Sequence, residues 1–412
     1  MTGPVLHVIT RLEAGGAPNT LLLLLEGLSA RGIAVELATG LTEPPAEDLL
    51  DQARELGFPI HVIPSLRRDL HPLHDLAALF SLWRLMRRIR PVLVHAHTSK
   101  GGFMGRLAAL LAGVKIRLYT PHGTVLTGYF GSTAEKIFAW LERLSARWTT
   151  RIIGLNRLES EAYLAAGIGR AHQHRQIENG IELERFSPLP EDLRRQRRHE
   201  EGIGDDEVVM ITVGRLVPVK DQLTLIAALG QLAEDLPAWR LMIVGEGPER
   251  SALEERTRSL GLTDRIAFLG QREDVPGLLG LSDLFVLTSV NEGFGLVLVE
   301  AMAGALPVIA TAVGGIPEVV IEAETGLLVP AGDPPALARA LERLLIDPDL
   351  RQRLGTRGRE IARERYGVDR MVEKTIALYE EVLGDPGGSG NRSGLAGRSA
   401  PGEERDGGPD RG

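Results

Sequence analysis

Short apolar runs, many of them rich in valine and isoleucine, alternate with helix-length segments along most of the chain. This alternation is typical of βαβ units, in which helices join parallel strands and cover both faces of the sheet. It predicts an α/β fold with two Rossmann-like, doubly wound domains facing each other. The predicted strands are Val5–Thr10, Ile33–Ala38, Ile60–Ile63, Val92–His95, Ile116–Thr120 and Arg151–Leu155 in the first half, and Val208–Val213, Arg240–Val244, Ile266–Leu269, Leu284–Thr288 and Pro307–Ala310 in the second.

A break in this alternation divides the chain. Pro188, Pro190 and the charged run Arg194–Glu201 interrupt it. We therefore predict a first domain over residues 1–183, a linker over 184–206 and a second domain over 207–367, followed by a helix over 368–384. Residues 385–412 carry almost no apolar side chains, which predicts a disordered tail.

Charge and cysteine content exclude several classes of function. The formal net charge of -8 argues against nucleic-acid binding, which usually needs a basic surface. The chain has no cysteine, so it has neither disulfides nor a zinc-thiolate site. No signal peptide is evident at the start, and no apolar run reaches the ~18 residues that span a bilayer. We expect a cytoplasmic protein whose membrane contact would be peripheral, on the inner face.

A glycine-rich motif with two acids follows the predicted strand Leu284–Thr288 and opens a helix. It runs Glu292-Gly-Phe-Gly-Leu-Val-Leu-Val-Glu300. Gly293 and Gly295 allow close approach of a ligand to the backbone, and the N–H groups of a new helix attract anions. Because helical side chains lean towards the N-terminus, Glu300 can reach back to a bound hydroxyl. The alternative is that both acids are merely solvated.

Two cations follow the first strand of the second half, where Gly214 is followed by Arg215 and, five residues on, by Lys220. Arg215 can grip phosphate oxygens as a fork, and Lys220 adds a point charge. This pair is suited to neutralising a diphosphate. The alternative is a surface arginine and a lysine at a helix start.

A further turn, Val244-Gly-Glu-Gly-Pro248, repeats the pattern of a strand followed by glycine. Arg250 occupies the position where a dinucleotide fingerprint has its third glycine, so NAD binding is not expected. We interpret Gly245 as part of a close backbone turn that lines a nucleotide site.

Histidines mark two strand ends in the first half. His122 lies where ligands of open parallel sheets bind, and a neutral imidazole can hydrogen-bond a sugar hydroxyl. His95 and His97 share one face of a strand, but no third ligand is evident, so we expect packing or acceptor contacts and no metal. Ser99 and Lys100 open the next helix and offer a site for an acceptor phosphate.

Three segments have more than one interpretation. Leu12–Pro18, with Gly15 and Gly16, is either a tight turn before a helix or a loop that closes over a ligand. Leu79–Arg90 is either a helix that packs on the sheet or an interfacial basic helix. Asp347-Pro-Asp349 matches a metal-diphosphate motif of another fold, but its context favours a helix boundary.

Together these motifs resemble the retaining glycosyltransferases of family four, with the two-domain GT-B fold, over roughly Val5–Leu383. The resemblance implies that Arg215 and Lys220 hold the donor diphosphate, Glu292 the sugar and Glu300 the ribose hydroxyls. It also implies that the last helix crosses back to the first domain. The implied donor-binding residues are Gly15, Gly16, Gly214, Arg215, Lys220, Gly245, Glu292, Gly293, Phe294, Gly295, Leu296 and Glu300, and the acceptor-side residues are His97, Ser99, Lys100 and His122.

The segment Asn179-Gly-Ile-Glu182 resembles the family's exit from the first domain, with Glu182 in place of the commoner aspartate. The resemblance is closest to the capsule, exopolysaccharide and lipid-linked glycan branch, which implies a UDP-sugar donor and a glycan or polyprenyl-diphosphate-linked acceptor. Neither acid is placed as a covalent nucleophile, so we expect front-face, metal-independent transfer with retention. The expected catalytic residues are His122, Arg215, Lys220 and Glu292. The alternatives are an epimerase or phosphorylase of the same fold, or an inactive sugar- or nucleotide-binding subunit.

Overall fold

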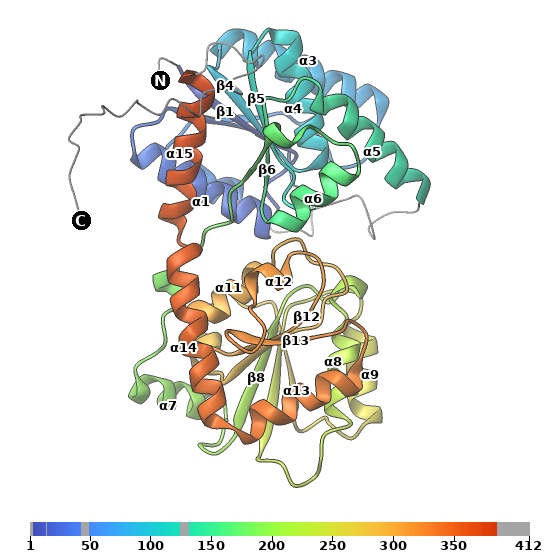
Figure 1. Ribbon diagram of the computed structural model, residues 1–412, viewed down its shortest axis with the longest axis vertical. Coiled ribbons are helices and arrows are strands. Elements are labelled where there is room, and N and C mark those ends of the chain that lie inside the picture. Colours follow the sequence, from blue (N-terminus) through green and yellow to red (C-terminus); the bar gives the residue numbers. More distant parts are fainter. Residues whose placement is uncertain (1–2, 14, 43–48, 124–131, 385–412) are drawn as a thin grey trace, which may run out of the picture.

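A computed structural model describes residues 3–13, 15–42, 49–123 and 132–384, and the predicted tail 385–412 lies outside them. The strands form a seven-stranded sheet of order β3-β2-β1-β4-β5-β6-β7 and a six-stranded sheet of order β10-β9-β8-β11-β12-β13. Neighbouring strands pair in parallel, and helices cover both faces of each sheet, which gives two stacked domains (Figure 1). The predicted fold class is therefore confirmed.

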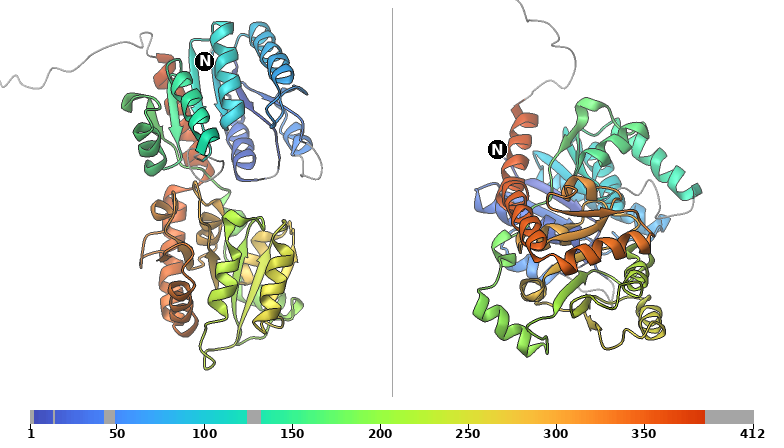
Figure 2. Two further views of the ribbon diagram at one scale, coloured as in Figure 1. Left: turned by 90° about the vertical axis from the view of Figure 1, so that its right-hand side faces the viewer. Right: turned by 60° about the horizontal axis from the view of Figure 1, so that its bottom comes forward.

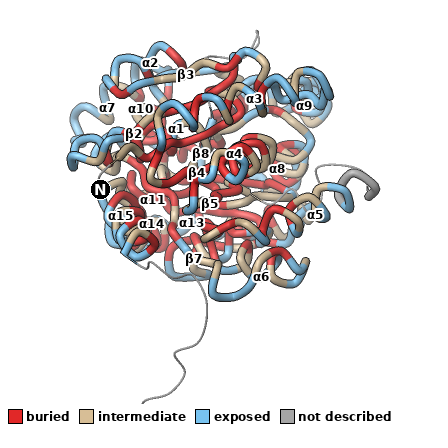
Figure 3. The backbone as a smooth tube through the Cα atoms, turned by 90° about the horizontal axis from the view of Figure 1, so that it is seen from above, coloured by how far each residue is buried: buried red, intermediate tan, exposed pale blue. Residues whose placement is uncertain are grey.

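The strands are short, and most are buried on both faces. β1, Val-Leu-His-Val-Ile, is buried at every position, as expected of a parallel strand between two helical layers. Figure 3 shows buried strands within partly exposed helices. The bounds are β1 (Val5–Ile9), β2 (Val35–Thr39), β3 (Ile60–Val62), β4 (Leu93–His97), β5 (Ile116–Thr120), β6 (Arg151–Gly154), β7 (His174–Gln176), β8 (Val208–Val213), β9 (Trp239–Val244), β10 (Ile266–Gly270), β11 (Leu284–Leu287), β12 (Val308–Thr311) and β13 (Gly326–Val329).

The helices of the first domain are α1 (Gly16–Ala30), α2 (Leu50–Glu55), α3 (Pro72–Ile89), α4 (Ser99–Ala112), α5 (Ser132–Ala146) and α6 (Arg157–Ala165). After them come α7 (Glu191–Glu200), α8 (Gln222–Leu229), α9 (Arg250–Ser259), α10 (Val275–Leu281), α11 (Leu296–Ala303), α12 (Ile316–Val319), α13 (Pro334–Ile346), α14 (Pro348–Arg365) and α15 (Val368–Gly384). Short 3₁₀ turns occupy Ala171–Gln173, Leu183–Phe186 and Pro218–Lys220. Among the described residues, no helix is both long and apolar enough to cross a membrane.

Two strands were not predicted. β7, His-Arg-Gln, is a polar edge strand, so it lacks the apolar run that marks a buried strand. β13 is also at an edge; it begins at Gly326 and is only four residues long. The remaining strands lie where the apolar runs predicted them, with ends shifted by at most two residues.

The chain passes between the domains at two adjacent points. Ile181 forms a parallel bridge with Gly367, and the Ile181 N–H donates to the Tyr366 carbonyl oxygen at 2.9 Å. A side chain at Gly180 would approach Val368 Cα to 2.7 Å, so the two crossings are in close backbone contact. Beyond this point α15 packs against α1 of the first domain, while α14 packs against α11 of the second (Figure 2).

The segment predicted as a linker contains helix α7. Arg194 and Arg198 of α7 pair with the Asp283 carboxylate at 2.7 and 3.0 Å, and Arg198 is buried. These contacts attach α7 to the second domain, next to α10. The prolines that broke the predicted pattern precede this helix, and Pro190 is its N-cap.

Candidate functional site

The carboxyl-terminal edges of the two sheets face each other, and the loops that follow the strands meet there. Asn156, the N-cap of α6, donates a hydrogen bond of 2.6 Å to the Gly293 carbonyl oxygen of the second domain. Glu318 of α12 accepts hydrogen bonds from the backbone N–H groups of Arg157 and Leu158 at 2.8 and 2.7 Å. The facing loops are thus held in direct contact.

The glycine-rich motif of the second domain forms the start of α11, as its sequence predicts. Gly295 is the N-cap in the left-handed region, with φ of 77°. The Phe294 ring is buried and makes an edge contact with the Tyr366 ring at a centroid distance of 5.5 Å. This contact attaches the loop to the core of the second domain. Leu296 lies opposite Gly16 of the first domain, because a Cβ on Gly16 would approach its Cδ1 to 3.1 Å.

Glu292 and Lys220 form an ion pair in this structure. Both side chains are about four-fifths buried, and Ser289 Oγ donates to the same carboxylate at 3.3 Å. The structure thus brings together two of the residues that the sequence placed in different motifs. Arg215 differs: it is exposed, and its guanidinium has no hydrogen bond or ion pair with any described residue.

Glu300 lies on α11 as predicted, and burial raises the pKa of its carboxyl to about 7, an effect that the positive charge of Arg185 opposes. Arg185 itself pairs at 2.9 Å with Glu182, the residue that stands in place of the commoner aspartate. Glu300 therefore takes up a proton at a higher pH than an exposed glutamate does.

The structure confirms the close backbone turn predicted at Gly245 and shows which backbone it contacts. A Cβ at this residue would approach the Gly214 carbonyl oxygen to 2.0 Å, and φ is 136°. The next glycine, Gly247, is just as close to the Leu216 carbonyl, at 2.2 Å. These glycines let the turn after β9 pack on the loop that carries Arg215, so they support the position of that loop in the candidate site.

The loop after β12 was missed by the sequence interpretation. A Cβ on Gly314 would approach the Glu292 carbonyl oxygen to 2.0 Å, and one on Gly315 the Gly293 carbonyl oxygen to 2.2 Å. The Gly315 N–H donates to the Glu292 carbonyl oxygen at 3.0 Å. The available signal was Gly-Gly-Ile-Pro two residues after a buried strand, where the proline marks a helix start.

In the first domain, His122 follows β5 with φ of 59°, in the left-handed region that a histidine rarely adopts. The next N–H, that of Gly123, donates to the Glu159 carboxylate at 3.1 Å, and a Cβ on Gly293 would lie 3.1 Å from Gly123 Cα. Burial raises the pKa of Glu159 to about 7, although hydrogen bonds from the Leu155 and Gly123 N–H groups oppose the shift. Asn156 and Glu159 were missed; the Asn-x-x-Glu spacing after a strand was their signal.

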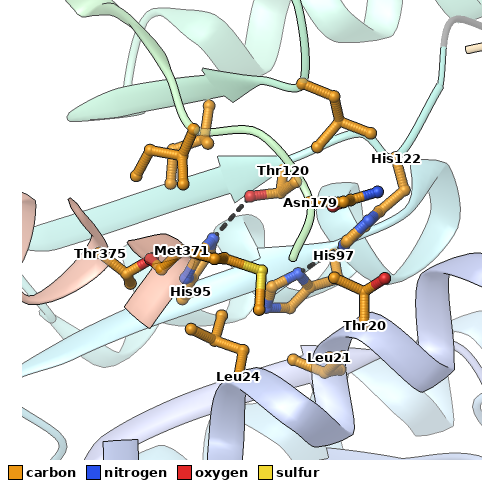
Figure 4. Close-up of a pocket in the computed structure, with 13 residues that line it drawn as sticks. Thr20, Leu21, Leu24, His95, His97, Thr120, His122, Asn179, Met371 and Thr375 are labelled. Atoms are coloured by element: carbon orange, nitrogen blue, oxygen red, sulfur yellow. Dashed lines mark hydrogen bonds between the residues drawn. The ribbon is translucent and has the colours of Figure 1, made fainter. Parts of the chain in front are cut away.

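His95, His97 and His122 line a small cavity between α1, β4, β5 and α15 (Figure 4). His7 of β1 lies beside them, and ring nitrogens of His7, His95 and His97 all fall within 4.8 Å of one another. His7 is thus a third possible ligand, which the sequence analysis missed: β1 is the neighbour of β4, and the pairing of these strands places His7 beside His95.

Burial keeps these rings neutral. It lowers the pKa of His7 to about 3 and that of His122 to about 4. The pKa values of His95 and His97 also lie well below the ordinary value because of burial, and the neighbouring histidines lower them further. At neutral pH each imidazole thus carries one proton and offers one lone pair.

The helix start after β4 differs from the expected phosphate site. Lys100 pairs with Asp75 of α3 at 2.6 Å. A Cβ on Gly101 would approach the Thr10 backbone nitrogen to 2.7 Å, and one on Gly102 would approach the Tyr119 ring to 2.2 Å. These glycines let α4 pack closely on the sheet. No described contact joins Ser99 or Lys100 to the histidine cluster, whereas His97 and His122 belong to it.

Asp347 caps α14 by accepting from the Leu350 N–H at 2.8 Å, which is the helix boundary that was predicted. Gly15 and Gly16 begin α1, where Gly15 is the N-cap and Gly16 faces Leu296. Ala14, within the same loop, lies outside the described residues.

Comparison with known proteins agrees with this geometry. The family description "Glycosyl transferases group 1" matches residues 194–361, and "Glycosyl transferase 4-like domain" matches residues 15–180. The UDP-Gal:alpha-D-GlcNAc-diphosphoundecaprenol alpha-1,3-galactosyltransferase of Escherichia coli is 32% identical over 344 residues, covering 82% of this chain and 87% of that protein.

Two solved structures share the whole architecture. HepE of Anabaena, in complex with UDP, has 25% identity and a TM-score of 0.78, covering 92% of this chain and 100% of that one. Sucrose-phosphate synthase of Thermosynechococcus elongatus has 27% identity and a TM-score of 0.80, covering 93% and 99%. With two matched domains and a relative that is similar over nearly its whole length, this chain belongs to the group 1 glycosyltransferases of family four, whose GT-B fold it has.

Proposed function

We propose that this enzyme transfers a sugar from a UDP-sugar to a glycan or polyprenyl-diphosphate-linked acceptor in polysaccharide biosynthesis, with retention at the anomeric carbon. The observation that carries the proposal is the Lys220–Glu292 pair beside the N-terminus of α11, with Arg215 exposed nearby. A cation for phosphate, an acid for sugar hydroxyls and a helix N-terminus for negative charge are thus grouped at one strand edge. UDP is the ligand named for HepE, which supports UDP as the donor nucleotide.

In this proposal Arg215 and Lys220 neutralise the diphosphate as it leaves, and Glu292 holds hydroxyls of the transferred sugar. Gly293, Phe294, Gly295 and Leu296 present backbone N–H groups, and Glu300 accepts from the ribose hydroxyls. The protein supplies the positive charge from its own side chains, so transfer proceeds without a metal. Gly15 and Gly16 cover the donor from the first domain, where His122 faces the acceptor.

The acceptor proposal has support from the surface of α3. Leu73, Leu76 and Phe80 are 58–72% exposed on one helix face, and Arg84 and Arg88 continue it towards the C-terminus. An apolar face followed by arginines suits an anionic membrane. The Escherichia coli relative carries a diphosphoundecaprenol acceptor in its name, and such a surface would hold the enzyme beside a membrane-bound acceptor of that kind.

Transfer from radiolabelled UDP-sugars to a polyprenyl-diphosphate-linked sugar tests the function, and NMR of the product tests retention. Turnover that needed no acceptor, or that needed free phosphate, would contradict it. Flotation with vesicles that contain phosphatidylglycerol tests the membrane surface. Leu73, Leu76 and Phe80 changed together to serine should abolish flotation, and Ile346→Ser, an exposed apolar residue of α13, is the matched control.

A further inference from the structure

Six side chains in the first domain form one continuous chain of hydrogen bonds. His122 Nε2 bonds His97 Nδ1 at 3.0 Å, and His97 Nε2 bonds His7 Nδ1 at 3.0 Å. His7 Nε2 is 3.3 Å from the hydroxyl of Tyr379, which also bonds His95 Nδ1 at 2.8 Å. His95 Nε2 then bonds Thr120 Oγ1 at 2.8 Å, as Figure 4 shows for that end of the chain.

In this chain of hydrogen bonds, the position of each proton fixes the positions of the others. Each neutral imidazole and each hydroxyl carries one proton, and each hydrogen bond needs one proton between its two atoms. Six groups share five bonds, so one proton is left over: on His122 Nδ1, on an outward O–H of Thr120, or on Tyr379, whose oxygen can accept from both His7 and His95. Every other arrangement would set two donors or two lone pairs against each other in a buried site.

The surroundings of these three groups decide between the states. Tyr379 is fully buried, and within the described residues its hydroxyl bonds only His7 and His95, so a leftover proton there would have no acceptor. Thr120 is 5% exposed and, within the described residues, its hydroxyl has no partner other than His95. The His122 ring lines the small cavity at the edge that faces the second domain, and its Nδ1 is buried without a partner in the described part of the chain. A buried donor needs an acceptor, and a bound substrate can supply one at this edge, so the leftover proton belongs on His122.

We propose that Thr120, through His95, Tyr379, His7 and His97, fixes His122 in the tautomer that presents an Nδ1–H donor to the substrate. In the proposed function His122 then binds an oxygen that can accept a hydrogen bond, such as a ring, hydroxyl or phosphate oxygen of the acceptor. It does not take a proton from the attacking hydroxyl. Tyr379 and Thr120 are positioning residues. Because Tyr379 lies on α15, the docking of this helix contributes to fixing the His122 tautomer.

The hydrogen-bond chain also accounts for the ring nitrogens that would otherwise bind a metal. Both nitrogens of His95 are used by Tyr379 and Thr120, and those of His7 by His97 and Tyr379. A metal held by His7, His95 and His97 would require these bonds to break. Metal binding is therefore the competing outcome of the test.

The test is ¹⁵N NMR of the protein labelled at histidine, without substrate, with His122→Gln to assign the His122 signals. Long-range ¹H–¹⁵N correlations distinguish the two neutral tautomers. We expect Nδ1–H for His122 in the natural protein and in Thr120→Ser. Thr120→Val and Tyr379→Phe should give mixed or averaged tautomers of His122. Tyr366→Phe, which changes a buried tyrosine that is not part of the hydrogen-bond chain, should leave the tautomer unchanged.

An Nε2–H tautomer in the natural protein overturns the proposal, as do identical His122 signals in all variants. A stoichiometric metal, or a change in the signals of His7, His95 and His97 on adding EDTA, replaces it with a metal site. Acceptor KM should rise about twofold to tenfold in Thr120→Val, the effect of one impaired hydrogen bond, with UDP affinity unchanged. If the tautomer shifts but acceptor KM does not, the acceptor role of His122 is wrong and the hydrogen-bond chain stands.

Discussion

Asn156 of the first domain donates a hydrogen bond of 2.6 Å to the carbonyl oxygen of Gly293 in the second. The same asparagine caps helix α6 by accepting from the Glu159 N–H at 2.7 Å. One side chain thus joins the helix start of one domain to the glycine-rich loop of the other. Glu318 adds a second connection, because its carboxylate accepts from the first two N–H groups of α6.

Replacing Glu318 by glutamine should open the domains. The change removes negative charge from a helix N-terminus and one of two acceptors, and hydrogen bonds to a charged group are worth ~1.5–3 kcal/mol each. We expect a larger radius of gyration by small-angle X-ray scattering, with an unchanged melting temperature for each domain. Glu161→Gln, on the exposed side of α6, is the control. Identical scattering of the two variants would show that Glu318 does not hold the domains together.

The affinity for UDP should depend on pH through Glu300. Its pKa is raised to about 7, so the carboxyl is mostly protonated at pH 6 and ionised at pH 8. Ribose hydroxyls donate to the ionised form, so affinity should fall as pH drops through 7, by up to about tenfold at one unit below the pKa. Calorimetry at pH 6 and 8 measures this. Glu300→Gln, which keeps the contribution of UDP ionisation, should lose most of the pH dependence; equal slopes would contradict the role of Glu300.

Much of the fold was predictable because parallel strands that are buried on both faces leave continuous apolar runs, as at Val208–Val213. Edge strands such as β7 do not, so they were missed. The motif Glu292–Glu300 was recognisable because a helix start needs glycine and free N–H groups at fixed spacing. All the residues of such a motif lie close together in the sequence, so the sequence alone reveals it.

The contacts that assemble the site were not local. Tyr379 reaches His7, 372 positions earlier, only because α15 returns to the first domain. No residue pattern near Tyr379 or near His7 indicates that the two side chains are in contact. His7 was missed for the same reason: a histidine inside an apolar strand is ordinarily packed there, and only the pairing of β1 with β4 places it beside His95.

Removing a buried side chain of α15 should destabilise the first domain. Leu378 is 4% exposed within the core that α15 forms with α1. Leu378→Ala should lower the free energy of unfolding by ~2–5 kcal/mol. Glu380→Ala, on the exposed side of the same helix, is the control. Urea unfolding measures both variants, and equal midpoints would mean that α15 is not docked in solution.

The ion pair between Lys220 and Glu292 means that a change at Glu292 also affects a residue proposed to bind phosphate. In this structure Glu292 neutralises Lys220, and donor binding would replace that interaction with phosphate oxygens. Removing the charge of Glu292 therefore acts on the sugar and also releases Lys220. In the proposed function Arg215, whose guanidinium has no partner among the described residues, contacts phosphate only.

Glu292→Gln should lower transfer by ~10²-fold or more, the scale of a lost transition-state contact, while UDP affinity stays equal or becomes tighter because Lys220 is freed. Arg215→Ala removes a charge-assisted contact worth ~1.5–3 kcal/mol, so both UDP affinity and turnover should fall, affinity by about tenfold to a hundredfold. Arg256→Ala, an exposed arginine of α9, should leave both unchanged. Calorimetry with UDP and a radiolabelled transfer assay on the three variants measure these effects. If Glu292→Gln weakened UDP as much as Arg215→Ala does, Glu292 would serve the nucleotide and not the sugar.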